Sequence, residues 1–371
     1  MECKIFSFFS GAGFLDLGFE KAGYDVVFAN EIYKDFAYCY RYAREHMGID
    51  APKYGLANDD VCSYLTEATK LETLKKQVES ERSSQTLVGF IGGPPCPDFS
   101  VAGKNKGSEG KHGILSQVYM DLICEVKPDF FLFENVKGLW KTAKHRVFFN
   151  SLLEQAEKHG YALAYKLVNS LQYGAPQDRD RILLFGVQKE LLCDNGLSSL
   201  SGFSWGLRDA VDATCIKNMN WPEITAFGQD SGIPLGIDET LTVEYWFRKN
   251  DVTNHPNAHD HFQPKAALKK MVSIGEGDVS RKAYKRLHRW RYSPTVAYGN
   301  NEVHWHPYEQ RRLSAAEALS LQSLPKEFIL PPDLTLSSMF KTIGNGVPFL
   351  LAQAVAGAIR GYLEHNVQKK S

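Results

Sequence analysis

A short apolar run that ends at a proline-flanked cysteine is the feature that most constrains the fold. Residues 87–91 are all apolar or glycine, which is typical of a strand buried on both faces of a parallel sheet. The run leads into Gly92-Gly93-Pro94-Pro95-Cys96-Pro97-Asp98-Phe99-Ser100. Open α/β sheets bind ligands at the carboxyl ends of their strands, and prolines stiffen the backbone. We therefore expect an α/β fold that holds the Cys96 thiol at its binding edge. Taken alone, an inert cysteine in a surface turn is the simpler interpretation.

The first thirty residues have the pattern of a nucleotide-binding βαβ unit. A strand is expected at residues 4–9, a glycine turn at 10–13, a helix after it, and a second strand at 25–29 that ends at Glu31. An acid at this spacing is placed to bind a ribose hydroxyl pair, although Glu31 is also compatible with a helix N-terminal acid. The glycine pattern is incomplete as a dinucleotide signature.

Two further acids follow expected strand ends. Asp60 is placed to accept from an adenine amino group or, equally well, to cap a helix. Residues 128–133 form another expected buried strand that ends at Glu134. Because parallel strands end at one edge, Glu134 and Cys96 can share a site. The alternative is a surface acid.

Two arginines are spaced to lie on one face of an extended chain. Arg179 and Arg181 are two residues apart, and paired guanidiniums suit recognition of an anion or a carbonyl. The alternative is a pair of salt bridges to Asp178 and Asp180.

The pattern weakens between about residues 189 and 302, which predicts a separate, irregular lobe. Residues 281–291 are basic, with no acid, and either bind phosphate or form a solvated helix face. Regular structure returns with a capping box at Ser314 and Glu317. A close-approach turn at residues 344–346 then precedes a helix at 349–363. We expect domains at residues 1–189, 190–305 and 306–371, the last completing the first.

Composition limits the class of protein. The 371 residues have no net charge, which argues mildly against nucleic-acid binding, although local charge matters more. No apolar run reaches the roughly 20 residues of a membrane span, and we expect no signal peptide. The seven cysteines are scattered without metal-ligand spacing, which predicts free thiols, no metal site and a cytoplasmic location.

In combination, these segments strongly resemble the cytosine-C5 DNA methyltransferases. The ordered blocks cover the chain apart from the irregular lobe, and they are Phe9-Ser10-Gly11-Ala12-Gly13, Asn30-Glu31, Asp60-Val61, Gly93-Pro94-Pro95-Cys96, Glu134-Asn135-Val136, Gln177-x-Arg179-x-Arg181, Arg312-Leu313-Ser314-x-x-Glu317 and Gly344-Asn345-Gly346-Val347-Pro348. The resemblance implies a Rossmann-like mixed sheet that binds S-adenosylmethionine. It also implies a smaller target-recognition lobe with DNA in the cleft between the lobes.

The resemblance also implies roles for individual residues. The expected cofactor-binding residues are Phe9, Ser10, Gly11, Ala12, Gly13, Glu31, Ile32, Asp60, Val61, Gly93, Pro95, Leu115, Asn345, Gly346 and Val347. Pro94, Ser100 and Thr295 are the expected substrate contacts. Three places depart from the common family pattern: Ser7 stands where Asp is frequent, Phe14 where a second Gly is usual, and Pro97-Asp98 where Gln and a small residue are usual.

The implied chemistry gives Cys96 the role of a nucleophile that adds to C6 of a flipped cytosine. Glu134, carrying or sharing a proton, would act at N3, and Arg181, with Arg179 on the same face, at O2. The glycine- and lysine-rich segment after Ser100 is the expected lid. The alternatives are an RNA cytosine methyltransferase, a nicotinamide dehydrogenase and a catalytically silent DNA-binding relative. The family also suggests a monomeric bacterial or phage modification enzyme with a possible cognate endonuclease.

Overall fold

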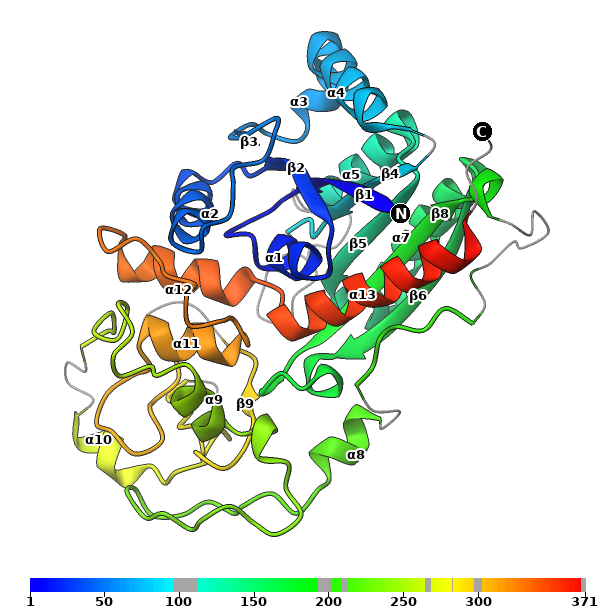
Figure 1. Cartoon of the computed structure of the whole chain (residues 1–371). Helices are drawn as coiled ribbons and strands as arrows, with labels where there is room; N and C mark the ends of the chain where they lie inside the picture. Colours follow the sequence, from blue (N-terminus) through cyan, green and yellow to red (C-terminus); the bar gives the residue numbers. More distant parts are fainter. Residues whose placement is uncertain are drawn as a thin grey trace.

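The protein forms two lobes, one built on a sheet and one largely irregular (Figure 1). The structure is a computed structural model. It describes residues 1–83, 85–95, 113–192, 200, 202–208, 212–263, 268–281, 283–296 and 302–367. The predicted nucleophile Cys96 and the predicted substrate contact Ser100 therefore lie outside the described residues, as does the expected lid.

The larger lobe contains a seven-stranded sheet in which one strand runs against the rest. Its order is β3 (Leu56–Ala57), β2 (Asp25–Asn30), β1 (Glu2–Phe8), β4 (Thr86–Gly92), β5 (Phe130–Val136), β8 (Asp180–Gln188) and β6 (Tyr161–Asn169). β8 is antiparallel to both neighbours, and the remaining pairs are parallel. The expected mixed α/β architecture is confirmed.

The strand register brings the predicted site residues to one edge. Phe8 at the end of β1 is opposite Gly92 at the end of β4, and Gly92 is opposite Phe133 of β5. The residues that follow β1 and β4 therefore leave the sheet together, and they are the start of the glycine turn and the start of the cysteine segment. Glu134, which follows Phe133 within β5, lies at the same edge.

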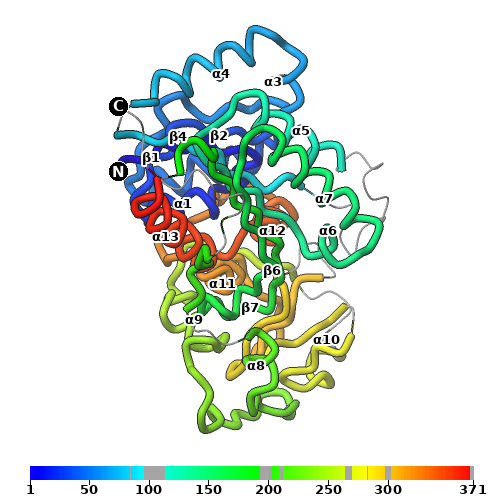
Figure 2. Tube along the Cα trace, turned by 90° about the vertical axis from the view of Figure 1, so that its right-hand side faces the viewer, coloured from blue at the N-terminus to red at the C-terminus, as the bar shows by residue number. Residues whose placement is uncertain are grey.

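Helices cover both faces of this sheet (Figures 1 and 2). On one face, Ile5 of β1 packs in a cluster with Leu15 of α1 (Phe14–Lys21) and Leu351 of α13 (Phe349–Asn366). On the other face, Phe6 and Phe8 pack in a second cluster with residues of α4 (Ala68–Glu81), α5 (Gly113–Val126) and α7 (Ala143–Lys158). Alternate residues of β1 thus face opposite layers, as a strand buried on both sides requires.

Shorter elements connect these layers. They are α2 (Lys34–His46), α3 (Ser63–Thr66), α6 (Gly138–Lys141), η2 (Ser170–Tyr173), β7 (Gln177–Asp178) and η3 (Lys189–Leu191). α6 and α7 are separated only by Thr142, so the chain is helical for most of residues 138–158.

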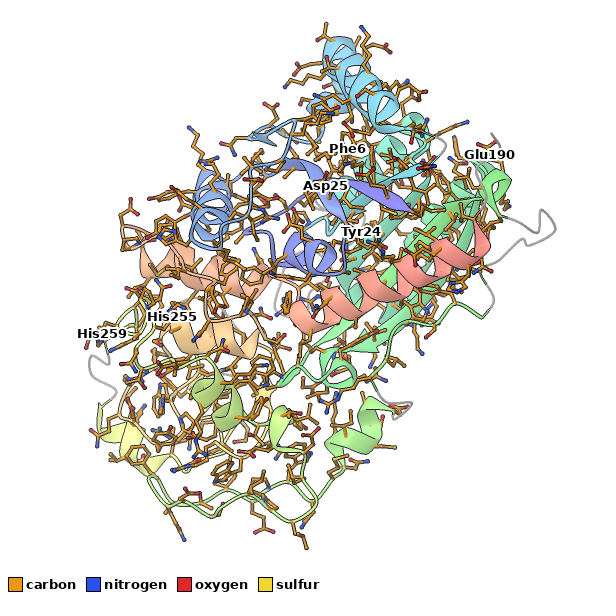
Figure 3. All side chains as sticks on the ribbon, in the orientation of Figure 1. Phe6, Tyr24, Asp25, Glu190, His255 and His259 are labelled. Carbon is orange, nitrogen blue, oxygen red and sulfur yellow. The ribbon has the colours of Figure 1, made fainter. Side chains whose placement is uncertain are left out.

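The second lobe has little regular structure within the part of it that is described. Its elements are α8 (Ala213–Lys217), η4 (Glu239–Leu241), α9 (Val243–Lys249), α10 (Leu268–Ser273) and β9 (Ser293–Pro294). β9 pairs with β7, which ties this lobe to the larger one. Figure 3 shows Phe6, Tyr24 and Asp25 in the upper lobe and His255 and His259 lower in the molecule.

The described residues of the basic segment 281–291 form no helix, so the expected helix face is wrong. Two of its arginines are engaged in contacts within the lobe. Arg286 is fully buried and donates to the carbonyls of Ile274 and His306, and burial lowers its pKa to about 10. Arg289 forms ion pairs with Glu276, at 2.9 Å, and Asp230, at 3.2 Å. These two guanidiniums organise the lobe from inside and are not free to contact phosphates.

The chain returns to the larger lobe through α11 (Ala315–Leu321), α12 (Leu336–Asn345) and α13. The predicted capping box is confirmed: Ser314 accepts from the Glu317 amide, and the Glu317 side chain accepts from the Ser314 amide. Residues Leu336–Asn366 are long and apolar enough to cross a membrane by length and composition, but they form two helices, and 61% of the tested window is buried. Their buried side chains belong to the core clusters.

Candidate active site and cofactor cradle

Glu134 and Arg181 meet at the carboxyl edge of the sheet. Val136 is opposite Arg181 in the β5–β8 ladder, so Glu134, two residues earlier, lies on the same face. Arg181 Nε is 2.6 Å from Glu134 Oε1, and both side chains are only 10% exposed. The Glu134 carboxyl and the Arg181 guanidinium are thus held together where little solvent reaches them.

The acidic neighbours of Arg181 have other partners, which leaves it available to Glu134. Asp180 pairs with Lys137 at 2.8 Å, and Asp178 pairs with Lys217 at 2.6 Å. Asn169 donates to both aspartates. The alternative of salt bridges from the arginines to Asp178 and Asp180 is therefore wrong for Arg181.

The start of the cysteine segment lies against this ion pair. A Cβ built on Gly93 would lie 2.5 Å from Glu134 Oε2, so only glycine lets the backbone approach the carboxyl this closely. Asn135 donates to the Pro94 carbonyl at 3.2 Å. Pro94 is buried and Pro95 half-buried. Strand β5 thus fixes the backbone that enters the Cys96 segment.

Arg179 is placed differently from Arg181. It is 2% exposed, and its Nη2 donates to the Gly344 carbonyl at 2.7 Å, at the end of α12. Its contacts hold the turn between α12 and α13. The structure therefore brings Glu134 and Arg181 together and directs Arg179 to another wall of the site.

Two glutamines that the sequence analysis did not single out brace the same turn. Gln322 donates to the carbonyls of Ile343 and Gly346, and it accepts from Gln177 Nε2 at 3.1 Å. Gln177 Oε1 accepts from the amide of Val296, where the chain leaves the second lobe. Both side chains are fully buried. Only the position of Gln177 within the arginine block was a signal for this network.

The glycine turn after β1 has a backbone that few residues adopt. Phe9, Gly11 and Gly13 have φ values of 55°, 58° and 83°. A left-handed φ is unusual at a bulky residue such as Phe9. A Cβ on Gly11 would meet nothing within 4 Å, so the backbone here faces open space. Ser10 is buried, with its amide donating to Asn30, and Ala12 belongs to a core cluster.

Glu31 is locked to this turn. Its Oε2 accepts from the Gly11 amide at 2.9 Å, and its Oε1 accepts from the Tyr33 amide at 2.8 Å. Burial raises the pKa of Glu31, and these amide hydrogen bonds oppose that effect. Next to it, the Ile32 side chain is 49% exposed. An acid and an uncovered apolar side chain therefore lie beside the glycine turn.

Asp60 and Val61 have separate roles in the structure. Asp60 is exposed, and its Oδ1 accepts from the Cys62 amide at 3.0 Å in the turn that leads into α3, which is close to the expected alternative of a helix cap. Val61 is buried in the core beneath Tyr64 and Phe8. Burial and a hydrogen bond to the Asp60 carboxylate raise the pKa of the Cys62 thiol to about 11.

The turn between α12 and α13 presents the remaining predicted cofactor residues. Gly344 and Asn345 are the last residues of α12, so the turn expected at residues 344–346 begins as the end of a helix. Asn345 is exposed, and Val347 is buried beside the first core cluster. A Cβ on Gly346 would lie 2.0 Å from the Phe14 ring, which confirms a close approach, although to a side chain. Leu115 is half-buried on α5.

Two departures from the family pattern have structural explanations. Phe14 is 2% exposed and packs edge-on against Phe328, with ring centroids 5.0 Å apart. It fills the space above Gly346. The Ser7 hydroxyl donates at 2.7 Å to Asp16, whose fully buried carboxyl also accepts from Tyr40. The carboxyl that the family often has at position 7 thus has a counterpart on α1.

Thr295, a predicted substrate contact, lies where the lobes join. It is exposed, and its hydroxyl donates to the Asp178 carbonyl at 2.7 Å. It therefore contacts the residue that directly precedes Arg179, at the end of β7.

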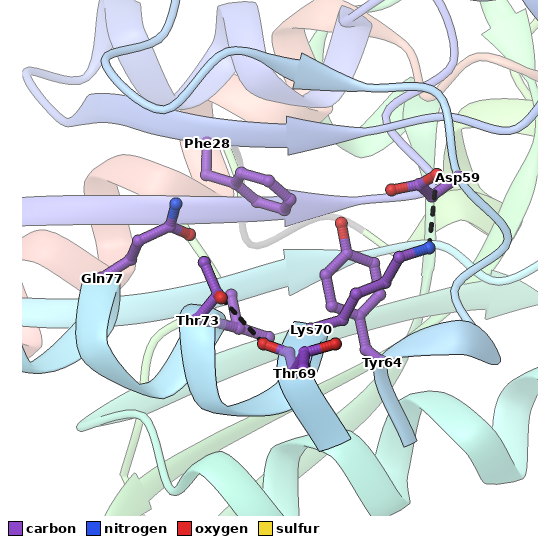
Figure 4. Close-up of a pocket in the computed structure, with 8 residues that line it drawn as sticks. Phe28, Asp59, Tyr64, Thr69, Lys70, Thr73 and Gln77 are labelled. Atoms are coloured by element: carbon purple, nitrogen blue, oxygen red, sulfur yellow. Dashed lines mark hydrogen bonds and ion pairs between the residues drawn. The ribbon is translucent and has the colours of Figure 1, made fainter. Parts of the chain in front are cut away.

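A hollow of about 240 Å³ elsewhere on the lobe contains none of the predicted residues (Figure 4). It lies between β2 and α4, where Lys70 Nζ is 3.5 Å from Asp59 Oδ1. Among the described ranges, no group of three or more His, Cys, Asp or Glu side chains is arranged to hold a metal ion.

Comparison with known proteins agrees with this geometry. Residues 3–361 match the model of the C-5 cytosine-specific DNA methylase family. The chain is 54% identical over 367 residues to the type II methyltransferase M.NmeDI of Neisseria meningitidis serogroup C, covering 98% of this chain and 85% of that protein. It is 29% identical to the type II methyltransferase M.MthTI of Methanothermobacter thermautotrophicus, covering 98% and 99%.

Solved structures share the fold. A prophage-encoded E. coli protein described as a DNA modification methyltransferase superposes with a TM-score of 0.67 at 23% identity, covering 98% of this chain and all of that one. The S. pombe Dnmt2 methyltransferase gives 0.58 at 14% identity, covering 98% of each chain. With the family match across nearly the whole sequence, the chain belongs to the C-5 cytosine-specific DNA methylase family.

Proposed function

We propose that this protein transfers a methyl group from S-adenosylmethionine to C5 of a cytosine flipped out of a specific duplex DNA sequence. The observation that carries the proposal is the buried Glu134–Arg181 pair, which lies against the backbone of Gly93, three residues before Cys96. An acid and a cation beside a cysteine segment are what activation of a pyrimidine ring requires.

The residues around the glycine turn suit S-adenosylmethionine. The open space over Gly11, the carboxyl of Glu31 and the uncovered side chain of Ile32 offer a backbone surface, a hydroxyl acceptor and an apolar contact. The exposed carboxylate of Asp60 and the exposed side chain of Asn345 would complete the cradle. When bound, the cofactor supplies an electrophilic methyl group.

Cys96 is the proposed nucleophile. Its thiolate adds to C6 of the cytosine, and the electron pair of the C5–C6 double bond moves so that C5 can take the methyl group. Glu134 carries or shares the proton at N3, while Arg181 donates to O2, so the negative charge that develops on the ring is stabilised. After transfer, the C5 proton leaves to a base, the double bond re-forms and the thiolate is expelled.

Arg179 has a positioning role in this proposal. Its guanidinium holds the Gly344 carbonyl, and therefore the turn that presents Asn345 and Val347. It acts on the cofactor side of the site, while Arg181 acts on the base.

Duplex DNA is the proposed substrate in preference to RNA. The matched family is a DNA methylase family, and the lobe inserted between β8 and α11 spans more than a hundred residues, which is enough for major-groove contacts. The named relatives are type II methyltransferases, which supports a role as the modification enzyme of a restriction-modification system.

The test is methyl transfer by the wild type and by Cys96→Ala. The wild type should methylate duplex DNA, and bisulfite sequencing of a plasmid from expressing cells should report cytosine methylation at one sequence. Cys96→Ala should lose the activity and still bind S-adenosylmethionine. DNA that carries 5-fluorocytosine should trap a covalent adduct with the wild type, because fluorine cannot leave as a proton does. Unchanged turnover by Cys96→Ala would remove the nucleophile, and methylation of transfer RNA with no methylation of duplex DNA would reverse the choice of substrate.

A further inference from the structure

The segment that follows the Glu134 strand is basic and has no acid. Between Glu134 and Glu154 the chain carries five basic side chains and neither Asp nor Glu, and these are Lys137, Lys141, Lys144, His145 and Arg146. They lie on α6 and the first turns of α7 or immediately before α6. The sequence analysis did not interpret this run.

The structure separates the members of this run by what they contact. Lys137 is paired with Asp180, and His145 is buried against the Gly138 carbonyl. Lys141 and Lys144 are exposed, and neither pairs with any side chain in the described part of the chain. Two cations are therefore exposed without a protein partner among the described residues. Ion pairs between exposed side chains add little stability, so the lack of such a partner costs the fold little.

A shallow hollow of about 260 Å³ lies beside them. It is lined by Lys141, Ala143, Arg146, Val147 and Asn150. The Arg146 guanidinium is held in place, because its Nε donates to the Trp140 carbonyl at 2.9 Å and its Cζ lies 4.1 Å above the Trp140 ring. Holding the guanidinium in advance lowers the entropy cost of binding an anion.

The backbone adds to the positive potential here. The hollow lies at the start of the 16-residue helix α7, whose N-cap residue Thr142 makes no side-chain capping bond and whose first turn has no acid. The helix dipole and uncapped amides favour an anion at that end. This supplements the three cations of the patch and would not by itself define a site.

The patch adjoins the proposed reaction centre. α6 begins at Gly138, directly after the strand that ends at Val136 and carries Glu134. In Figure 2, α6 and α7 lie on the same side of the molecule as α10 of the second lobe. Each DNA strand has one phosphate per roughly 3.4 Å of helix axis, so a duplex with its target base at Glu134 presents several phosphates to the neighbouring surface.

We propose that Lys141, Lys144 and Arg146 form a patch that binds backbone phosphates of DNA flanking the target cytosine. This inference rests on the proposed function for the identity of the polyanion. Phosphate contacts carry no base information, so the patch contributes affinity that is independent of sequence.

The test is the salt dependence of duplex binding by Lys141→Gln/Lys144→Gln. The logarithm of the binding constant falls with the logarithm of salt with a slope of about 0.9 per phosphate contact, so the double variant should lower the slope by about 1.8. Between about 200 mM and 50 mM salt, the affinity deficit of the variant should then grow by about twelvefold. The deficit should be equal for duplexes with and without the methylated sequence.

A matched control removes two other exposed lysines. Lys158 lies at the opposite end of α7 and Lys76 on α4. Lys76→Gln/Lys158→Gln loses the same net charge and should keep the wild-type slope. A third variant, Val147→Lys, adds a cation at a side chain that is 71% exposed in the hollow, and it should strengthen duplex binding and steepen the slope.

The proposal is overturned if the Lys141/Lys144 variant keeps the wild-type slope, if the control loses as much, or if the deficit appears only with transfer RNA. Each variant is also compared in thermal melting, since surface substitutions should leave Tm unchanged. A changed slope in a protein that fails to methylate DNA would reject the proposed function alone. An unchanged slope in an active enzyme would reject the patch alone.

Discussion

Gly346 tests how the turn between α12 and α13 is packed, because the three atoms nearest to a Cβ placed there all belong to the Phe14 ring. Its backbone angles, φ −64° and ψ 153°, are allowed for any residue, so alanine is not strained by conformation. The added Cβ would, however, lie 2.0 Å from the Phe14 ring. The ring would have to retreat by about 1.4 Å to reach ordinary contact at 3.4 Å. Phe14 cannot easily do so, because it is 2% exposed and packed on Phe328.

Gly346→Ala should therefore destabilise the protein by about 1–3 kcal/mol, the usual cost of overpacking a core. It should also weaken S-adenosylmethionine binding, because Asn345 and Val347 flank the displaced position. Phe14→Ala alone should cost roughly 3–5 kcal/mol through the cavity it leaves. In that background the alanine at 346 has room, so the double variant should be about 1–3 kcal/mol more stable than the sum of the single effects.

Urea unfolding monitored by two probes, with calorimetric titration of the cofactor, measures both quantities. Gly357→Ala on α13 is the matched control, since a Cβ there meets nothing within 4 Å, and it should be neutral or stabilising. Additive effects of Gly346→Ala and Phe14→Ala, within about 0.5 kcal/mol, would refute the steric argument.

Three further predictions follow from contacts described above. Arg181→Gln leaves the Glu134 carboxyl buried without its guanidinium, so the free energy of unfolding should fall by about 3–5 kcal/mol and kcat by roughly 10²–10³-fold. Arg181→Lys should be intermediate in both quantities. Full activity of Arg181→Gln in steady-state assays would contradict the pairing. Burial acts to raise the pKa of Glu317, but His306 and Arg311 more than offset it and bring the pKa to about 2. Because this folded pKa lies below the unfolded value near 4.5, the stabilisation is present above that pH and is lost as pH falls towards 2, so Glu317→Gln should flatten acid unfolding in this window; an unchanged acid limb would count against the ion pairs. Arg286→Met orphans several buried carbonyls and should lower Tm while leaving the salt slope of DNA binding unchanged, whereas a reduced slope would restore its phosphate role.

The sequence predicted well those elements whose signal is a pattern of residues close together in the chain. The buried strands at β1, β2, β4 and β5 are apolar runs bounded by glycine or polar residues, and the ends of each lie within three residues of their expected places. The capping box is local as well, since Ser314 and Glu317 are three residues apart. The meeting of Glu134 with the start of the cysteine segment follows from strand ends sharing an edge.

The misplaced features depend on contacts between distant segments. Whether Arg179 faces the base or the α12–α13 turn is decided by the Gly344 carbonyl, 165 residues away. Arg286 is buried because the carbonyls of Ile274 and His306, in loops distant in the sequence, surround its guanidinium. The residues next to Arg286 in the sequence do not predict how these loops pack. The Gln177–Gln322 hydrogen bond joins residues 145 positions apart, and single glutamines carry no periodic signal.

The last helix has a consequence for how the protein is made. α13 covers α1, and Arg360 donates to the carbonyls of Ala22 and Gly23, which precede it by 338 and 337 positions. At roughly 5–20 residues per second, a ribosome needs about 20–70 s to synthesise the intervening chain. During that interval the apolar side of the first βαβ unit is not covered by α13, so a nascent chain should depend on chaperones until this helix emerges.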